Sequence, residues 1–237
     1  HDVTQLIGEM SRKSADVETV HDSAGDRVIE EYTLLNALPR DVADAHISGA
    51  LHLDNMGSWV LKTSGLMHDL RFYLQHGLVF RNSSSQRISV KPPKSLKSAL
   101  SMTVNILGLA EAEVSGEQTI DFFNLFVAPL AKGLSRNEVK EELWQFLMSV
   151  NLTATTGVSL GLEVVPPSFL VESKVSGAGG EALGVYEDYV EQSIVIASLL
   201  VECLKEAKEV KPIFNPSVIV KMRPGILNDD KAEALIF

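Results

Sequence analysis

The side chains best suited to chemistry in this sequence are six histidines and a single cysteine. His46 and His52 stand six residues apart, and His68 and His76 stand eight apart. Neither spacing places two imidazoles on one helix face, as helical metal sites require, so we predict structural or surface histidines and no metal site. Cys203 lies within an apolar segment, which predicts a buried and inert thiol. One cysteine allows neither an intramolecular disulfide nor a cysteine-based zinc site.

Phosphate-binding and nucleophile motifs are weak or missing. No Walker loop occurs, and the glycine-rich stretch from Gly177 to Gly184 lacks dinucleotide-fingerprint spacing and a preceding strand, so it predicts a flexible loop. No Gly-x-Ser-x-Gly elbow is present, and a Ser/His/Asp triad cannot be read from one sequence, because its members meet only in the fold. Motifs alone therefore predict no catalytic residue.

Composition is that of a soluble globular protein. The 237 residues are 45% hydrophobic and carry a formal net charge of −10, which repels phosphate backbones and argues against a nucleic-acid partner. The longest apolar run, 194–201, is too short to span a bilayer. The first residues do not resemble a signal peptide, and one cysteine is typical of a reducing compartment, so we expect a cytoplasmic protein without membrane contact. No clear linker occurs, which favours one domain over 1–237.

Apolar spacing and capping residues predict a helix-rich α/β fold. Expected helices cover 26–48 (in two pieces, the second begun by Pro39 and ended by Gly49), 67–75, 95–112 after Ser95, 119–132 after Thr119, 135–150 after a Ser135/Glu138 capping box, 186–208, and a last one from Lys231. Loops are expected over 81–94 and 171–184. Two buried strands are expected, within 155–165 and 216–222.

Five segments, in order, resemble the anaerobic (class III, glycyl-radical) ribonucleoside-triphosphate reductases. They run from Leu38-Pro-Arg-Asp-Val-Ala-Asp-Ala-His46 to His52, then Glu113-Val-Ser-Gly-Glu-Gln-Thr-Ile-Asp-Phe122, Thr156-Gly-Val-Ser-Leu-Gly-Leu162, Tyr186-Glu-Asp-Tyr189 and Lys211-Pro-Ile-Phe-Asn-Pro216. Each motif is short, but together they span most of 20–223.

The resemblance implies an α/β barrel of two half-barrels that reduces ribonucleoside triphosphates to deoxyribonucleotides, the precursors of DNA, by radical chemistry. A glycyl radical there generates a thiyl radical on a barrel cysteine. This sequence would correspond to the first part of the barrel, without the preceding ATP cone. Gly65 and Leu66 stand where the family often has a further cysteine, and Gly157 stands where it usually has asparagine. The thiyl cysteine and radical glycine would lie beyond Phe237, so the chain as written is expected to have no catalytic residue of its own.

The resemblance also implies a set of substrate-binding residues: His52, Asn55, Ser115, Gly116, Gln118 and Ser159. Ser115 and Gly116 would offer backbone N–H groups near a helix start, where phosphates bind readily. The same two residues fit a plain turn between helices equally well. His52 fits a core histidine equally well. The expected ligand is a nucleoside triphosphate with magnesium, and no other cofactor is expected in this chain.

Two other interpretations stay open from the sequence. The chain could be a non-catalytic regulatory relative that kept the scaffold and dimerises through 95–112, 119–132 and 186–208. It could instead be an unrelated helical domain, which a structure lacking a parallel half-barrel with 158–165 and 217–222 inside it would indicate. Under the family reading, expected partners are a second copy, a missing catalytic half and a radical-activating protein.

Overall fold

The structure is a computed structural model that describes residues 17–58, 62–81, 87–176, 178–210, 213–221 and 223. The chain divides into two compact units, one of His1–Ser64 with Glu113–Ser115, the other of Gly65–Ala112 with Gly116–Phe237.

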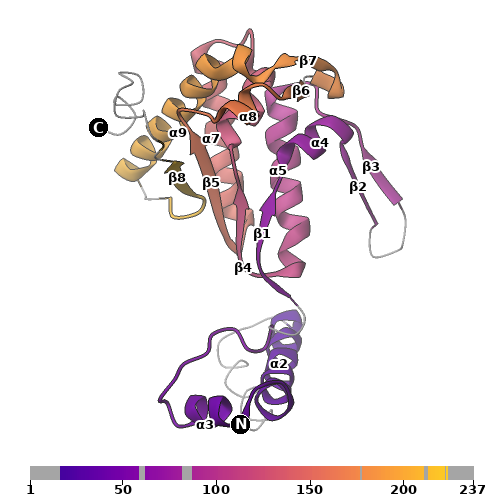
Figure 1. The fold of residues 1–237 in the computed structure, drawn as a ribbon, viewed down its shortest axis with the longest axis vertical. Coiled ribbons are helices and arrows are strands. Elements are labelled where there is room, and N and C mark those ends of the chain that lie inside the picture. The colour runs from indigo at the N-terminus through magenta and orange to yellow at the C-terminus, as the bar shows by residue number, and fades with distance from the viewer. Residues whose placement is uncertain are drawn as a thin grey trace. The chain divides into compact units, whose positions relative to one another are not determined.

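The first unit is helical in its described part (Figure 1). Helix α2 (Val17–Tyr32) continues into a π-helical turn, Thr33–Ala37, and α3 (Arg40–Ile47) follows. Pro39 caps the start of α3, and Gly49 beyond its end has a φ of 78°. The two-piece helix expected over 26–48 is therefore confirmed, with the proline and the glycine in the predicted roles.

A four-stranded sheet has the order β1-β4-β5-β8. Its strands are β1 (Thr63–His68), β4 (Val114–Ile120), β5 (Gly157–Glu163) and β8 (Ser217–Lys221). β4 and β5 are parallel, and so are β5 and β8, with Ser159 paired with both Thr119 and Ser217. Both strands expected from the sequence are confirmed, and with them the helix-rich α/β fold class.

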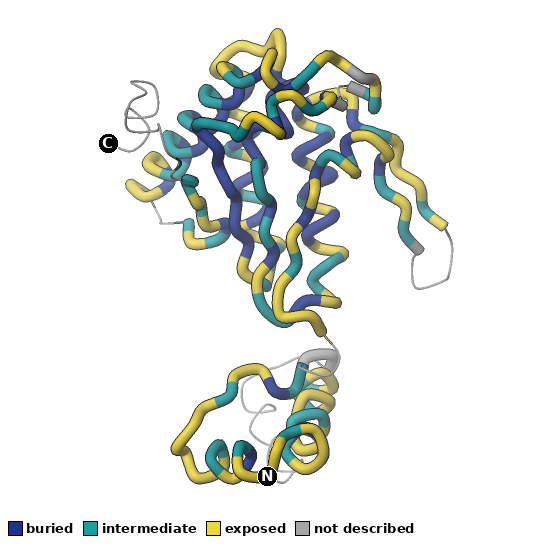
Figure 2. Tube along the Cα trace, in the orientation of Figure 1, coloured by how far each residue is buried: buried dark blue, intermediate teal, exposed yellow. Residues whose placement is uncertain are grey.

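Helices pack on one face of this sheet and form the core with it (Figures 1 and 2). The main ones are α5 (Leu96–Ala110), α6 (Phe123–Val127), α7 (Arg136–Thr153) and α9 (Val190–Val210), with a 3-10 turn over Ala128–Ala131. α5 and α9 both pack on α7, and α6 packs on β5 and α9. Capping boxes open α5 at Ser95 and α7 at Ser135, so both predicted helix starts are confirmed.

The structure corrects four expected elements. Met67 and His68 end β1, and the helix there is the shorter α4 (Leu70–His76), capped by Asp69. The expected loop over 81–94 contains β3 (Arg87–Val90), which forms a hairpin with β2 (Leu78–Arg81) just before it. The expected loop over 171–184 contains a second hairpin, β6 (Lys174–Ser176) and β7 (Ala182–Val185), between α8 (Ser168–Val171) and a 3-10 turn at Tyr186–Tyr189.

The fourth correction concerns Thr119, which lies inside β4 and opens no helix; α6 begins at Phe123. The buried positions of β4 are Val114, Gln118 and Ile120. A polar residue on the buried face weakened the two-residue period that identifies a strand. The helix expected from Lys231 lies outside the described residues. No helix in the described ranges is long and apolar enough to cross a membrane.

Candidate functional site

The face of the sheet away from the helices is polar. Along β5, Val158, Leu160 and Leu162 join the helical core, so the alternate residues point to the opposite face. By the strand register, that face carries Glu117, Thr119 and Asp121 from β4 and its end, Gly157, Ser159, Gly161 and Glu163 from β5, and Ser217, Ile219 and Lys221 from β8. Parallel strands bring their carboxyl ends to one edge, the usual place for ligands in such sheets.

An ion pair joins the ends of β4 and β8 on this face. Lys221 Nζ donates to Asp121 Oδ2 at 2.5 Å and lies 4.0 Å from the centroid of the Phe122 ring. The other carboxylate oxygen accepts the backbone N–H of Phe122 at 3.0 Å. The carboxylate lies directly against Gly161 of β5, where a Cβ atom would clash with it. The absence of a side chain on Gly161 thus makes room for the pair.

A second ion pair lies beside the first, because Glu163 is the register partner of Lys221. Arg223 Nε and Nη2 donate to the two Glu163 carboxylate oxygens, each at 2.8 Å, in the bidentate geometry that guanidinium favours. The carboxylate raises the pKa of Arg223. Asn124 holds the same end of β5, since it accepts from Glu163 N at 2.9 Å and donates to Glu163 O at 2.8 Å and Ser193 O at 3.1 Å.

Ser159, one of the predicted site residues, lies in the middle of the polar face. Its hydroxyl donates to the Glu117 carboxylate and lies 2.8 Å from the hydroxyl of Ser217. Ser159 is buried, whereas Glu117 and Ser217 are exposed. Three neighbouring strands therefore each supply one oxygen-bearing side chain to this cluster.

Gln118 points to the other side of β4 and is fully buried. Its amide nitrogen donates to Leu107 O and to Thr156 Oγ1, both at 3.0 Å, and its amide oxygen lies 2.9 Å from His68 Nε2. Since the amide oxygen can only accept, His68 Nε2 carries a proton. Gln118 thereby links β4 to β1, α5 and the start of β5.

Ser115 and Gly116 lie within β4, which corrects both the expected helix start and the alternative of a turn between helices; their role as ligand contacts stays a prediction. Their backbone groups belong to a strand, and the Ser115 hydroxyl donates to Thr63 O at 3.2 Å. Serine and glycine are common in turns and at helix starts, so this pair gives no local sign of the strand.

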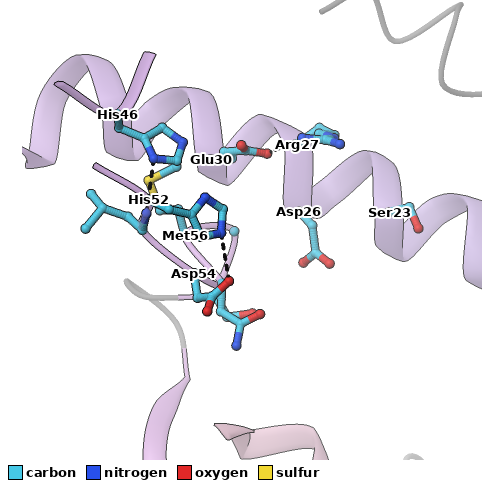
Figure 3. Close-up of a pocket in the computed structure, with 12 residues that line it drawn as sticks. Ser23, Asp26, Arg27, Glu30, His46, His52, Asp54 and Met56 are labelled. Atoms are coloured by element: carbon cyan, nitrogen blue, oxygen red, sulfur yellow. Dashed lines mark hydrogen bonds and ion pairs between the residues drawn. The ribbon is translucent and has the colours of Figure 1, made fainter. Parts of the chain in front are cut away.

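His52 and Asn55 line a polar pocket of about 390 Å³ in the first unit (Figure 3). His46 Nδ1 accepts from the backbone N–H of Leu53 at 3.1 Å, and His52 Nε2 lies 3.0 Å from Asp54 Oδ1. Other charged lining residues come from α2: Asp26, Arg27 and Glu30. The six predicted residues thus lie in separate places, with His52 and Asn55 in this pocket and Gln118 and Ser159 on opposite faces of the sheet.

The described residues contain no group of three or more histidine, cysteine, aspartate or glutamate side chains placed to hold a metal ion. Cys203 lies in α9, is buried, and donates weakly to Lys140 O of α7 at 3.8 Å. Burial raises the pKa of its thiol to about 11. The prediction of a buried thiol is confirmed, and the thiol lies among the helices and not on the polar face.

Sequence reasoning missed Asp121, Glu163, Lys221 and Arg223. A signal was present: polar residues and glycines alternate with the aliphatic residues over 157–163, and Ser217 and Lys221 continue that period in β8. The aliphatic residues of this pattern predict a strand with one buried face. The polar residues and glycines between them predict a polar second face.

Comparisons with known proteins agree with this architecture. A sequence model of the family "Anaerobic ribonucleoside-triphosphate reductase" matches residues 9–236. The Haemophilus influenzae and Salmonella typhimurium enzymes of that name are 27% and 25% identical to this chain over 128 and 144 residues, which are 53% and 59% of it. Those stretches make up 17% and 20% of the two relatives.

Among solved structures, the fold is similar to the anaerobic ribonucleotide reductase from Thermotoga maritima. The crystal structure with citrate in its active site gives a TM-score of 0.72 at 16% identity, covering 92% of this chain and 43% of that one. The structure with dATP in its specificity site gives 0.71 at 16% identity, covering 93% and 41%. The chain thus spans less than half of these structures. The alternative of an unrelated helical domain is wrong, because β5 and β8 pair in parallel and the family match covers nearly the whole chain.

Proposed function

The chain belongs to the anaerobic ribonucleoside-triphosphate reductase family, and from this premise we propose that it forms the nucleotide-binding first part of the barrel in an enzyme that reduces ribonucleoside triphosphates. The observation that carries the proposal is the polar sheet face. One face of the sheet is apolar and packs on the helices. The second face carries two ion pairs and a cluster of hydroxyl and carboxylate groups. Such groups suit a ligand rich in oxygen atoms.

Ser159 is the predicted site residue at the centre of this face, where its buried hydroxyl contacts the exposed side chains of Glu117 and Ser217. His52 and Asn55 stay predictions as ligand contacts within their own pocket. Gln118 supports the face from behind, as its amide fixes β4 against β5 through Thr156. Magnesium would accompany the triphosphate as its counterion.

The radical step needs a thiyl sulfur, and Cys203 does not provide one at this face, because it is buried between α9 and α7. We propose that the thiyl cysteine and radical glycine belong to the remainder of the barrel, and that a radical-activating protein and a second copy are its partners. A cytoplasmic location is part of the same proposal.

A thermal-shift experiment tests nucleotide binding. A ribonucleoside triphosphate with magnesium should raise Tm by about 5 to 10 °C at a concentration 100 times Kd, since binding to the native state alone adds about 2.7 kcal/mol. Tripolyphosphate at the same concentration should have a smaller effect, because it lacks ribose and base. The absence of a shift with any nucleotide, at any magnesium level, would contradict the proposal.

A further inference from the structure

We propose that Lys221 and Arg223 form an oxyanion-binding pair on the polar sheet face, which recognises the phosphate oxygens of a polyphosphate ligand. The inference rests on the proposed function and specifies it, because it assigns the phosphate end of the ligand to the carboxyl ends of β4, β5 and β8.

The acceptor atoms of both ion pairs are withdrawn from solvent. The Glu163 side chain is 0% exposed, and both of its oxygens accept from Arg223. The Asp121 side chain is 17% exposed, with one oxygen engaged by Phe122 N and the other by Lys221. The two carboxylates therefore compensate the charges of the cations and are themselves less exposed than the cationic side chains.

The donor atoms are more accessible. The side chains of Lys221 and Arg223 are 28% and 33% exposed. A guanidinium carries five N–H donors and an ammonium three. Arg223 uses two nitrogens on Glu163, and Lys221 uses one N–H on Asp121, and among the described residues Lys221 has no second hydrogen-bond acceptor. The outward surface of the cluster is thus rich in N–H donors, and acceptor oxygens such as those of phosphate are the groups it can bind.

The ammonium of Lys221 is also held in place before any ligand arrives. The carboxylate of Asp121 fixes it on one side, and the ring of Phe122 lies beneath it at 4.0 Å. Gly161 is the positioning residue for this arrangement, because only a residue without Cβ lets the Asp121 carboxylate lie against β5. A donor that is already positioned loses less conformational entropy on binding.

Tripolyphosphate binding, measured by isothermal titration calorimetry on the full chain, tests the pair without ribose or base. Lys221→Met should weaken binding about tenfold or more, as expected for loss of a charged hydrogen bond. The double variant Asp121→Asn with Lys221→Met keeps the net charge of the protein and should lose the same affinity. Lys132→Met is the matched control, since exposed Lys132 also lies over an aromatic ring, that of Tyr189, and its loss should leave binding unchanged.

The outcomes separate this inference from the proposed function. If the wild-type chain binds ribonucleoside triphosphates and Lys221→Met binds tripolyphosphate equally well, the oxyanion pair is wrong and the proposed function stands. If tripolyphosphate binding depends on Lys221 but nucleotides bind no better than tripolyphosphate, the pair stands and the proposed function is wrong. If citrate binds as tightly as tripolyphosphate, with the same dependence on Lys221, the site recognises carboxylates and the phosphate assignment fails. If none of these ligands binds to the wild-type chain, both proposals are wrong.

Gly161→Ala separates positioning from general damage to the fold. In the wild-type background it should displace the Asp121 carboxylate and weaken tripolyphosphate binding. In an Asp121→Ala background, where no carboxylate lies against residue 161, the same substitution should cause no further loss of affinity. Equal losses in both backgrounds would show that Gly161 acts elsewhere.

Discussion

At the scale of single residues, the surroundings of a side chain decide its chemistry more than its type does. Ser159 and Gln118 are one strand apart and both were predicted to bind substrate, yet one faces the polar side of the sheet and the other is enclosed behind it. Cys203 is the most reactive residue type in the chain, but burial suppresses its ionisation. The histidines contact amide, backbone and carboxylate groups, as at His68, His46 and His52, in structural arrangements.

Cys203 should resist alkylation in the native state. The thiolate is the reactive form, and a thiol with a pKa of about 11 that is also buried contributes little of it at pH 8. Iodoacetamide labelling followed by mass spectrometry should be slow in buffer and complete in denaturant, and the native rate should rise as pH increases toward 11. Rapid native labelling at pH 8 would contradict the buried position.

At the scale of elements, local signals predicted more than long-range ones. The capping boxes at Ser95 and Ser135 and the stop at Gly49 lie within a few residues of the helices they delimit, so the sequence contained the full information. β4 escaped prediction because its buried face includes Gln118, whose partners lie 11, 38 and 50 residues away. The ion pairs of the polar face join residues 60 and 100 apart in the chain, which no local pattern specifies.

Asn124 is the residue that ties α6 and α9 to the end of β5. It is fully buried, and Asn124→Ala would leave backbone groups of Glu163 and Ser193 without their partners. We expect the free energy of unfolding to fall by about 3 kcal/mol, the cost of unsatisfied buried polar groups. Urea unfolding followed by circular dichroism measures the change, with Asn36→Ala on the exposed first-unit helix as a control. A loss equal to that of the control would show that the backbone relaxes around the site.

At the scale of the whole molecule, the main hydrophobic core among the described residues is drawn from the second unit. Its buried members run from Leu70 to Cys203 and include no residue of the first unit. The sequence shows no linker and therefore predicts a single domain over 1–237. Truncation of the chain can test this prediction.

A chain that begins at Thr63 should fold by itself. Because it keeps the whole core and all four strands of the sheet, its Tm should lie within about 5 °C of that of the full chain. Leu143→Ala in the shortened chain should then cost about 3 kcal/mol, as expected for a packed core. Loss of cooperative unfolding on truncation would show that the first unit is required for folding.

The parallel pairing of the sheet also has a consequence for how the chain acquires its structure. Gln118 pairs with Val158, and Leu160 with Val218, so partners are separated by about 40 and about 58 residues. Each pairing closes a long loop, whose entropic cost precedes any gain from contact, and folds rich in such pairings assemble slowly. During synthesis, the helices can form as they leave the ribosome, whereas β8 is translated last of the four strands. Lys221 belongs to β8 and Arg223 follows it, so the two ion pairs of the polar face can form only after β8 has been synthesised.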